Sequence, residues 1–256
     1  MPQLLRRKPE PPLPDTIDVA GGPLPLTIRQ NPRAKRMIMR IAPGGGGLVV
    51  TVPRGMAARK IREFLDRHRG WVEERVSRAP ERVVIAPGAV IPLRGEPTRL
   101  THRGGRLVTR LEALTNDPGA PDVAGPRQQL LVGGASDHFS RRVCDYLRRE
   151  ARRDLEAAVK RHACVVGLEP SAITIKDTTS RWGSCTHDRR LAFSWRIVMA
   201  PPEVLDYLAA HEVAHFREMN HGPKFWSLCR TLCPEMEAGK AWLKRHGSGL
   251  HAVGVG

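Results

Sequence analysis

Residues 211–215 read His-Glu-Val-Ala-His, and a third histidine, His221, follows after five intervening residues. On a helix, His211 and His215 are one turn apart and project from the same face, so both imidazoles can reach one ion. Glu212 is rotated by about 100° from His211, which suits a carboxylate beside an attacking water molecule. Three imidazole nitrogens with a fourth position open for water are the ligand set of a catalytic zinc site. The pattern therefore predicts Zn2+ held by the three histidines, with a metal-bound water activated by Glu212 as general base.

The third histidine makes this pattern specific. A shuffled chain of the same composition would contain H-E-x-x-H roughly once in forty trials, and requiring His221 as well lowers this to about one in a thousand. The metzincin pattern has the same separation, with a glycine halfway to break the helix. Glu218 occupies that position here. We therefore expect another device to turn the chain, at Asn220 and Gly222-Pro223, because Asn tolerates the left-handed conformation better than most residues.

Residues 180–185, Ser-Arg-Trp-Gly-Ser-Cys, precede the histidine motif and are typical of a tight turn between two strands. One interpretation is a structural corner around a buried Trp182. The other places Arg181 or Ser184 near the metal cleft, in contact with substrate or with a developing oxyanion. Tyr207, one turn before His211, is either a further substrate contact or a core residue. The sequence leaves both alternatives open.

Composition limits the environment and the partners. Apolar residues make up 41% of the chain and charged residues 27%, as in ordinary globular proteins. No stretch approaches the roughly 20 apolar residues of a membrane-spanning helix, so no membrane partner is expected. The basic start of the chain lacks the apolar core of a secretory signal. Five cysteines, without a CxxC pair, favour a reducing, cytoplasmic setting over a disulfide framework.

The net charge of +16 suits an acidic partner, because neutralising phosphates releases counterions. This makes nucleic acid a candidate partner. The alternative is an ordinary solvated surface, since the basic residues are spread along the whole chain instead of gathered in one tract. The charge alone does not decide between the two.

The first half of the chain is predicted to be β-rich after a flexible tail at residues 1–20. This N-terminal part covers residues 21–132 and contains one helix, Ala57 to about Arg78, with a long loop rich in Pro, Gly and Asp near residues 113–127. The predicted strands are Leu24–Arg29, Arg36–Ile41, Leu48–Val52, Val83–Leu93, Thr98–Thr101, Arg106–Leu111 and Gln129–Val132.

The second half, residues 133–256, is predicted to hold the chemistry. Ser136 is expected to cap a long helix that runs to about Val166. Two strands, Ile173–Lys176 and Leu191–Val198, precede a helix that opens at Pro201-Pro202 and runs to about Glu218. Two further helices are predicted at Pro223–Leu232 and Pro234–Arg245. The mixture of strands and helices indicates an α+β fold.

Several motifs resemble the YgjP-like metallopeptidase family, which is related to the SprT-like zinc proteins. They are Ser180–Cys185, Phe193–Arg196, Ala200–Pro202, Tyr207, His211–His215 and Asn220–Trp226, and upstream Val52-Pro53, the helix through Trp71, and Ile91–Glu96. The resemblance covers the chain except its tail and the loop near 113–127. It implies a zincin-like domain with the HExxH motif on a helix, a β-rich N-terminal part packed on it, zinc at His211, His215 and His221, and a catalytic Glu212.

Three functions follow as hypotheses. The first is a cytoplasmic zinc metallopeptidase that acts on a peptide or protein, with Glu212 passing the proton of the attacking water to the leaving amine. The second keeps the zinc and hydrolyses a nucleotide or phosphoanhydride, because Arg suits phosphate oxygens. The third is a DNA-associated protein, as the SprT-like kinship implies. Metal-dependent cleavage, nucleotide hydrolysis and salt-dependent binding of DNA distinguish them.

Overall fold

The computed structural model describes residues 12–20, 22–42, 45–114, 125–178 and 181–254. The chain divides into two compact units, Met1–Arg82 and Val83–Gly256. Each unit has its own core of buried apolar side chains. None of the described helices is long and apolar enough to cross a membrane. The strands and helices together form a mixed α/β structure, as expected.

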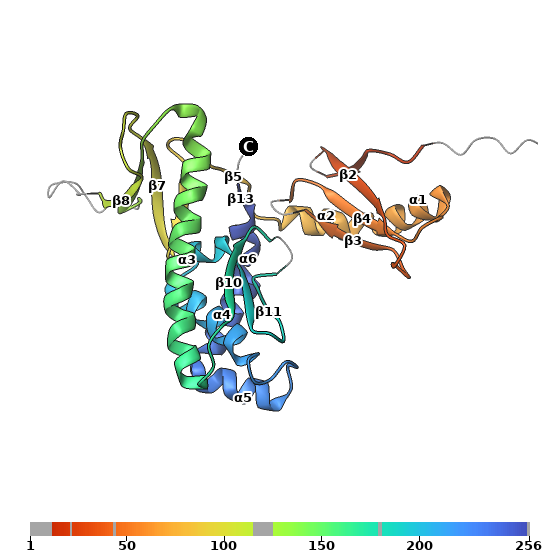
Figure 1. The fold of residues 1–256 in the computed structure, drawn as a ribbon. Helices are drawn as coiled ribbons and strands as arrows, with labels where there is room; N and C mark the ends of the chain where they lie inside the picture. Colours follow the sequence, from red (N-terminus) through yellow and green to blue (C-terminus); the bar gives the residue numbers. More distant parts are fainter. Residues whose placement is uncertain (1–11, 21, 43–44, 115–124, 179–180, 255–256) are drawn as a thin grey trace, which may run out of the picture. The chain divides into compact units, whose positions relative to one another are not determined.

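The first unit is a four-stranded sheet with two helices (Figure 1). Its strands lie in the order β1 (Thr16–Val19), β2 (Gly22–Gln30), β4 (Leu48–Val52) and β3 (Ile38–Ile41), and its helices are α1 (Ala58–Arg67) and α2 (Arg69–Ser77). Along β4, Leu48, Val50 and Val52 are buried while the residues between them are half-buried, because successive side chains of a strand point to opposite faces. Ile61 and Leu65 of α1 belong to the same core.

Two predictions for this unit are wrong in detail. The helix expected from Ala57 to Arg78 is broken at His68, whose backbone has φ −106° and ψ 11° and whose N–H is shared between the carbonyls of Phe64 and Leu65. The ring of His68 also donates from Nδ1 to the Phe64 carbonyl, at 2.8 Å. The predicted tail, 1–20, includes β1, which pairs antiparallel with β2. Residues 1–11 of that tail lie outside the described residues.

The second unit begins with another four-stranded sheet, which shares a core with a long helix (Figure 1). Its strands lie in the order β6 (Val90–Leu93), β7 (Glu96–His102), β9 (Gln128–Val132) and β8 (Arg110–Ala113), and the helix is α3 (Phe139–Val166). A separate short strand, β5 (Val83–Val84), pairs in parallel with β13 (Val253–Gly254) near the end of the chain. The predicted strand Val83–Leu93 is thus two strands, separated by a turn at Gly88 with φ 85°.

The boundary between the units lies after Arg82 and not near residue 132, where the sequence had placed it. Leu100 of β7 and Leu130 of β9 are fully buried in one cluster with Leu147 and Leu155 of α3. The sheet that was predicted to belong to the N-terminal part therefore shares its core with the second unit. Of the loop near 113–127, residues 115–124 lie outside the described residues.

The long helix α3 spans 28 residues and ends at Gly167, whose left-handed backbone (φ 71°) is a common helix stop. The prediction that Ser136 caps it is wrong. Ser136 begins a short 3-10 turn, Ser136–His138, and its hydroxyl donates to Asp137 Oδ1 at 3.2 Å. The capping position is His138, which makes no side-chain capping bond.

The rest of the second unit surrounds the histidine motif. A three-stranded sheet, in the order β10 (Ala172–Lys176), β12 (Arg190–Ser194) and β11 (Gly183–Cys185), has a parallel and an antiparallel pair. The predicted strand Leu191–Val198 stops at Ser194 and continues as a 3-10 helix, Trp195–Met199. Three helices follow, α4 (Pro202–Ala214), α5 (Pro223–Leu232) and α6 (Met236–Ala252), of which α5 matches its predicted bounds.

Ion pairs connect the turn between β6 and β7 to α3. Arg94, with φ 54°, donates from Nε to Asp154 Oδ2 at 2.7 Å and from Nη2 to Glu150 Oε2 at 2.8 Å. The backbone N–H groups of Arg94 and Gly95 donate to the carbonyls of Val198 and Met199. The turn therefore connects the four-stranded sheet, α3 and the residues that lead into α4.

We predict that Arg94→Ala lowers the free energy of unfolding by about 2 kcal/mol, because it removes both hydrogen bonds from Arg94 to Asp154 and leaves the buried carboxylate of Glu150 with Arg153 as its remaining close partner. Arg59→Ala is the matched control, since Arg59 and Glu63 form an exposed pair that contributes about 0.5 kcal/mol or less. Denaturant unfolding of both variants measures the difference. Equal losses in the two variants would contradict the role of Arg94.

Candidate metal centre

Helix α4 positions the first two residues of the motif. It begins with Pro201 at the capping position and Pro202 in the first turn, where a backbone N–H would have no hydrogen-bond partner within the helix. Val204 and Leu208 are buried against the core of the second unit. His211 and Glu212 lie in the last turn of the helix.

The chain leaves α4 earlier than predicted. The helix ends at Ala214 and not near Glu218, with His215 as its capping residue at φ −65° and ψ −14°. The N–H of Glu218 donates to the carbonyl of Ala214 at 3.1 Å, and the N–H of Gly222 donates to the carbonyl of Asn220 at 2.8 Å.

The next helix begins directly after this turn. Gly222 is extended (φ −82°, ψ −176°), and Pro223 follows in the first turn of α5. Asn220 does not use the left-handed conformation that was expected of it, since Arg94 and Arg189 are the non-glycine residues with positive φ in the described part of the chain. The turn is closed by backbone hydrogen bonds instead.

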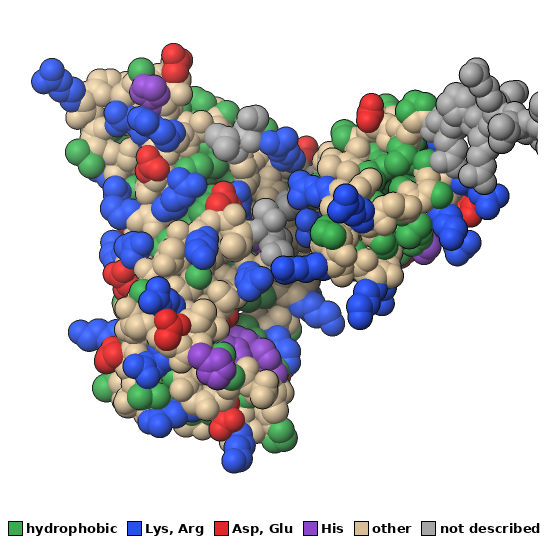
Figure 2. Space-filling view, turned by 45° about the vertical axis from the view of Figure 1, so that its right-hand side comes forward, with side chains coloured by type: hydrophobic (Ala, Val, Ile, Leu, Met, Phe, Trp, Pro, Cys, Tyr) green, Lys and Arg blue, Asp and Glu red, His purple; other side chains and the backbone are tan. Residues whose placement is uncertain are grey.

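The turn brings the three histidines together. One ring nitrogen from each of His211, His215 and His221 lies within 4.8 Å of the others. His211 Nε2 and His221 Nε2 are 3.0 Å apart. The rings of His211 and His215 are nearly perpendicular, with centroids 5.3 Å apart. Histidine side chains are seen gathered at the surface of the second unit in Figure 2.

The protonation of these rings suits a metal ligand set. His215 Nδ1–H donates to the carbonyl of Glu218 at 2.9 Å, and because a carbonyl only accepts, the proton is on Nδ1 and Nε2 keeps its lone pair. Burial lowers the pKa of His211 to about 4, and burial also lowers the pKa of His215. Both rings are therefore neutral at pH 7, as metal binding requires.

Aromatic side chains of α5 hold the histidine rings in place. Phe225 is fully buried, and its ring centroid lies 4.9, 4.6 and 4.5 Å from those of His211, His215 and His221. Trp226 lies 5.6 Å from His221 and 5.9 Å from His211. Sequence reasoning had not assigned these two residues to the site, although their position just after His221 was a usable signal.

Glu212 directly follows His211 on α4, and its side chain is buried. Its side chain is 4% exposed, and burial raises its pKa to about 7, with the charge of Arg181 acting in the opposite direction. The carboxylate of Glu212 lies against Gly183 of strand β11, which has no side chain. A Cβ added there would lie 2.4 Å from Glu212 Oε1, so a larger residue would displace the carboxylate. The need for glycine here was invisible in the sequence because it depends on a contact between β11 and α4.

The three tentative substrate residues lie in different environments. Arg181 is exposed, and its charge reaches Glu212. Ser184 is half-buried in β11, where it pairs with Ala192 of β12. Tyr207 is 6% exposed and packs edge-on against His211, with ring centroids 5.9 Å apart.

Trp182 belongs to a packed corner. Its ring stacks on that of His251 at 4.3 Å, and a Cβ added at Gly247 of α6 would lie 3.1 Å from it. Its backbone carbonyl accepts a hydrogen bond from Ser194 N–H at 2.8 Å. This corner fixes one end of β11, the strand that contacts Glu212.

Comparison with known proteins defines the class. The model of the YgjP-like metallopeptidase domain matches residues 35–246, which is most of the chain. The chain therefore belongs to the YgjP-like metallopeptidase family, as the sequence motifs indicated.

Two solved structures are similar to part of the chain. They are the metallopeptidase zymogen abylysin of Pyrococcus abyssi (15% identity, TM-score 0.31, 35% of this chain and 93% of that one) and the metallopeptidase zymogen jannalysin of Methanocaldococcus jannaschii (26% identity, TM-score 0.30, 35% and 95%). No curated protein matches the chain.

The geometry predicts one divalent metal ion per chain. His221→Ala removes an exposed side chain, so we expect the fold to persist and metal affinity to fall by more than about 100-fold. His187→Ala, in an exposed turn, is the control and should keep its metal. Elemental analysis and competition with a chelator measure both. Equal metal retention in the two variants would exclude His221 as a ligand.

Proposed function

We propose that this protein is a zinc metallopeptidase of the zincin type that hydrolyses peptide bonds of a peptide or protein substrate. His211, His215 and His221 would hold the zinc, and Glu212 would act as the general base. The observation that carries this proposal is the convergence of three imidazoles beside one buried carboxylate. The family is a metallopeptidase family, which agrees with this arrangement.

The donor set fits zinc. Three imidazoles are typical ligands for a catalytic zinc ion, and they leave one coordination position for water or substrate. The first four residues of the HExxH motif would lie on α4, which ends at Ala214. The last residue of the motif, His215, would be the capping residue of this helix. When bound, the zinc would polarise the scissile carbonyl and lower the pKa of a coordinated water molecule.

Glu212 would move the protons. A carboxyl group with a pKa of about 7 accepts a proton readily near neutral pH and releases it again. We infer that Glu212 takes the proton of the attacking water and delivers it to the leaving amine. This side chain is buried one residue after His211 on α4, and Gly183 of β11 provides the space in which it lies.

Substrate contacts are proposed for Arg181 and Ser184. Arg181 is an exposed cation close enough to influence Glu212, so its guanidinium is available to a substrate carbonyl or carboxylate. Ser184 lies next to Gly183 on the same strand. Tyr207 is better explained as a residue that positions His211, because its ring is buried against that imidazole and against Gly239.

A cytoplasmic location remains part of the proposal. All five cysteines are free thiols, which agrees with a reducing compartment. Hydrolysis of a nucleotide at this site has weaker support, because only two cations of the described residues act on the site, Arg181 on Glu212 and Lys240 on His211. Phosphoanhydride chemistry would call for several cations around the reacting group.

We predict that Glu212→Gln abolishes cleavage of an unfolded protein such as casein, with a loss of at least about 100-fold, because the amide cannot accept the proton. The zinc content should stay near that of the wild type, since the histidines are unchanged. Gel electrophoresis of the digested substrate and elemental analysis test both expectations. Full activity of Glu212→Gln, or cleavage by wild type that a chelator does not stop, would contradict the mechanism.

A further inference from the structure

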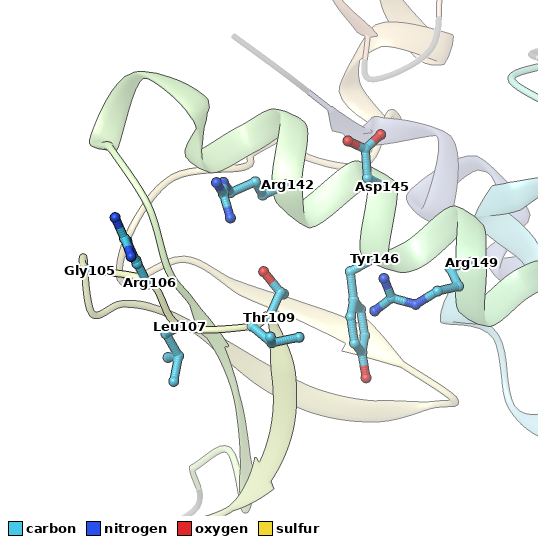
Figure 3. Close-up of a pocket in the computed structure, with 9 residues that line it drawn as sticks. Gly105, Arg106, Leu107, Thr109, Arg142, Asp145, Tyr146 and Arg149 are labelled. Carbon is cyan, nitrogen blue, oxygen red and sulfur yellow. The ribbon is translucent and has the colours of Figure 1, made fainter.

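A basic hollow lies on the second unit, between α3 and the turn that joins β7 to β8 (Figure 3). Its volume is about 510 Å³. Arg142, Tyr146 and Arg149 line it from α3, and residues 105–109 line it from the turn. None of the residues that hold or contact the histidine cluster takes part in this lining.

Three arginines line this hollow, and Asp145 is the one carboxylate among the described residues that line it. Arg106 and Arg142 have no carboxylate partner among the residues that the structure describes, and the Nε atom of Arg142 is buried there without a hydrogen-bond acceptor. Arg149 Nε is 4.0 Å from Glu150, a carboxylate that Arg94 and Arg153 already engage. Several guanidinium groups that line one hollow favour a bound anion.

The acidic residue at the rim does not neutralise the hollow. Asp145 pairs with Arg148 at 3.6 Å, outside the hollow, and its side chain projects away from Tyr146 in Figure 3.

The guanidinium of Arg142 is held in place by the backbone around Gly134. A Cβ added at Gly134, which has φ +88°, would lie 2.6 to 2.8 Å from the guanidinium, so the side chain passes directly over this glycine. The N–H of Gly134 donates to the carbonyl of Gly105 at 2.9 Å. His102 Nε2 lies 2.8 Å from the carbonyl of Gly134 and donates to it. The cation is therefore positioned before any ligand arrives.

A second hollow of about 590 Å³ adjoins the first, and the two share Gly105, Arg106 and Leu107. It adds the exposed Arg103, while Arg110 within it pairs with Glu112 at 2.6 Å. Arg106 thus stands between two hollows, with Arg103 in one and Arg142 and Arg149 in the other. This arrangement suits a chain that carries a negative charge at each repeating unit better than it suits one small anion.

The surface between the arginines is partly apolar. Val108, on the same turn, is 74% exposed and is among the exposed large apolar residues of the described chain. Leu107 is half-buried beside it. Nucleic acids present phosphates together with flat apolar base faces, so they match both features of this surface.

We propose that the groove formed by the β7–β8 turn and the first half of α3 binds the phosphate backbone of a nucleic acid, independently of the metal centre. Arg103, Arg106, Arg142 and Arg149 contact phosphates, and Leu107 and Val108 contact the bases. Binding of this kind is governed by salt, because each neutralised phosphate releases a counterion. The net charge of +16 strengthens the attraction at long range.

The test compares two variants of equal net charge. Arg106→Gln with Arg149→Gln removes two cations from the groove, whereas Arg36→Gln with Arg40→Gln removes two exposed cations from the first unit. Arg142 is left intact because its packing against Gly134 links it to the fold. Fluorescence anisotropy with a labelled single-stranded 20-mer of thymidine, over a series of salt concentrations, gives the affinity and its salt dependence.

The groove variant should bind at least about tenfold more weakly at low salt, and its slope of log affinity against log salt should fall by about 2. The control should keep the wild-type slope. Casein cleavage and thermal unfolding should stay at wild-type levels in both variants, so a failure of the proposed peptidase activity would be seen separately.

Three outcomes would overturn the proposal. One is equal loss of binding in the two variants, which would indicate a diffuse charge effect. Another is no binding by the wild type at low salt. The last is displacement of the oligonucleotide by polyglutamate at equal charge concentration, which would identify an acidic polypeptide as the ligand.

Discussion

The short connection between α4 and α5 is the constraint on which the site depends. α4 must stop at Ala214 for the chain to turn back and bring His221 to the two histidines of the motif. The turn is closed by backbone hydrogen bonds, and Pro223 starts α5 at once. As a result Phe225 packs against all three imidazole rings. Fixing three side chains in advance reduces the entropy that a bound ion would otherwise have to offset.

Periodicity predicted those parts of the fold in which local pattern and burial agree. β4, with its alternation of buried and half-buried residues, and α5, bounded by Pro223, were found within their predicted limits. Errors arose where tertiary contacts overrode local signals. The first unit's helix breaks at His68, and the sheet of β6 to β9 joins the core of α3, which no local pattern could reveal. Residue patterns also could not show that β1 pairs with β2.

The spacing of the motif in the sequence predicted the metal-binding histidines and the carboxylate next to them. The structure brings His211, His215 and His221 together and buries Glu212 beside them, although the helix between them is shorter than predicted. The contacts around the site could not be predicted from the sequence. They are the space at Gly183, the packing of Phe225 and the stacking of Trp182 on His251. Each of these depends on contacts between elements far apart in the chain. The sequence could not predict the groove between the β7–β8 turn and α3 for the same reason, because its arginines come from two separate segments.

The identity and position of the metal test the account most directly. Crystals grown with zinc, with diffraction data collected above and below the zinc absorption edge, would locate the ion by its anomalous signal. The account predicts one strong peak per chain, about 2.0 to 2.1 Å from a ring nitrogen of each of His211, His215 and His221. A peak bound elsewhere, or no peak at this cluster when zinc is supplied in excess, would contradict the central claim.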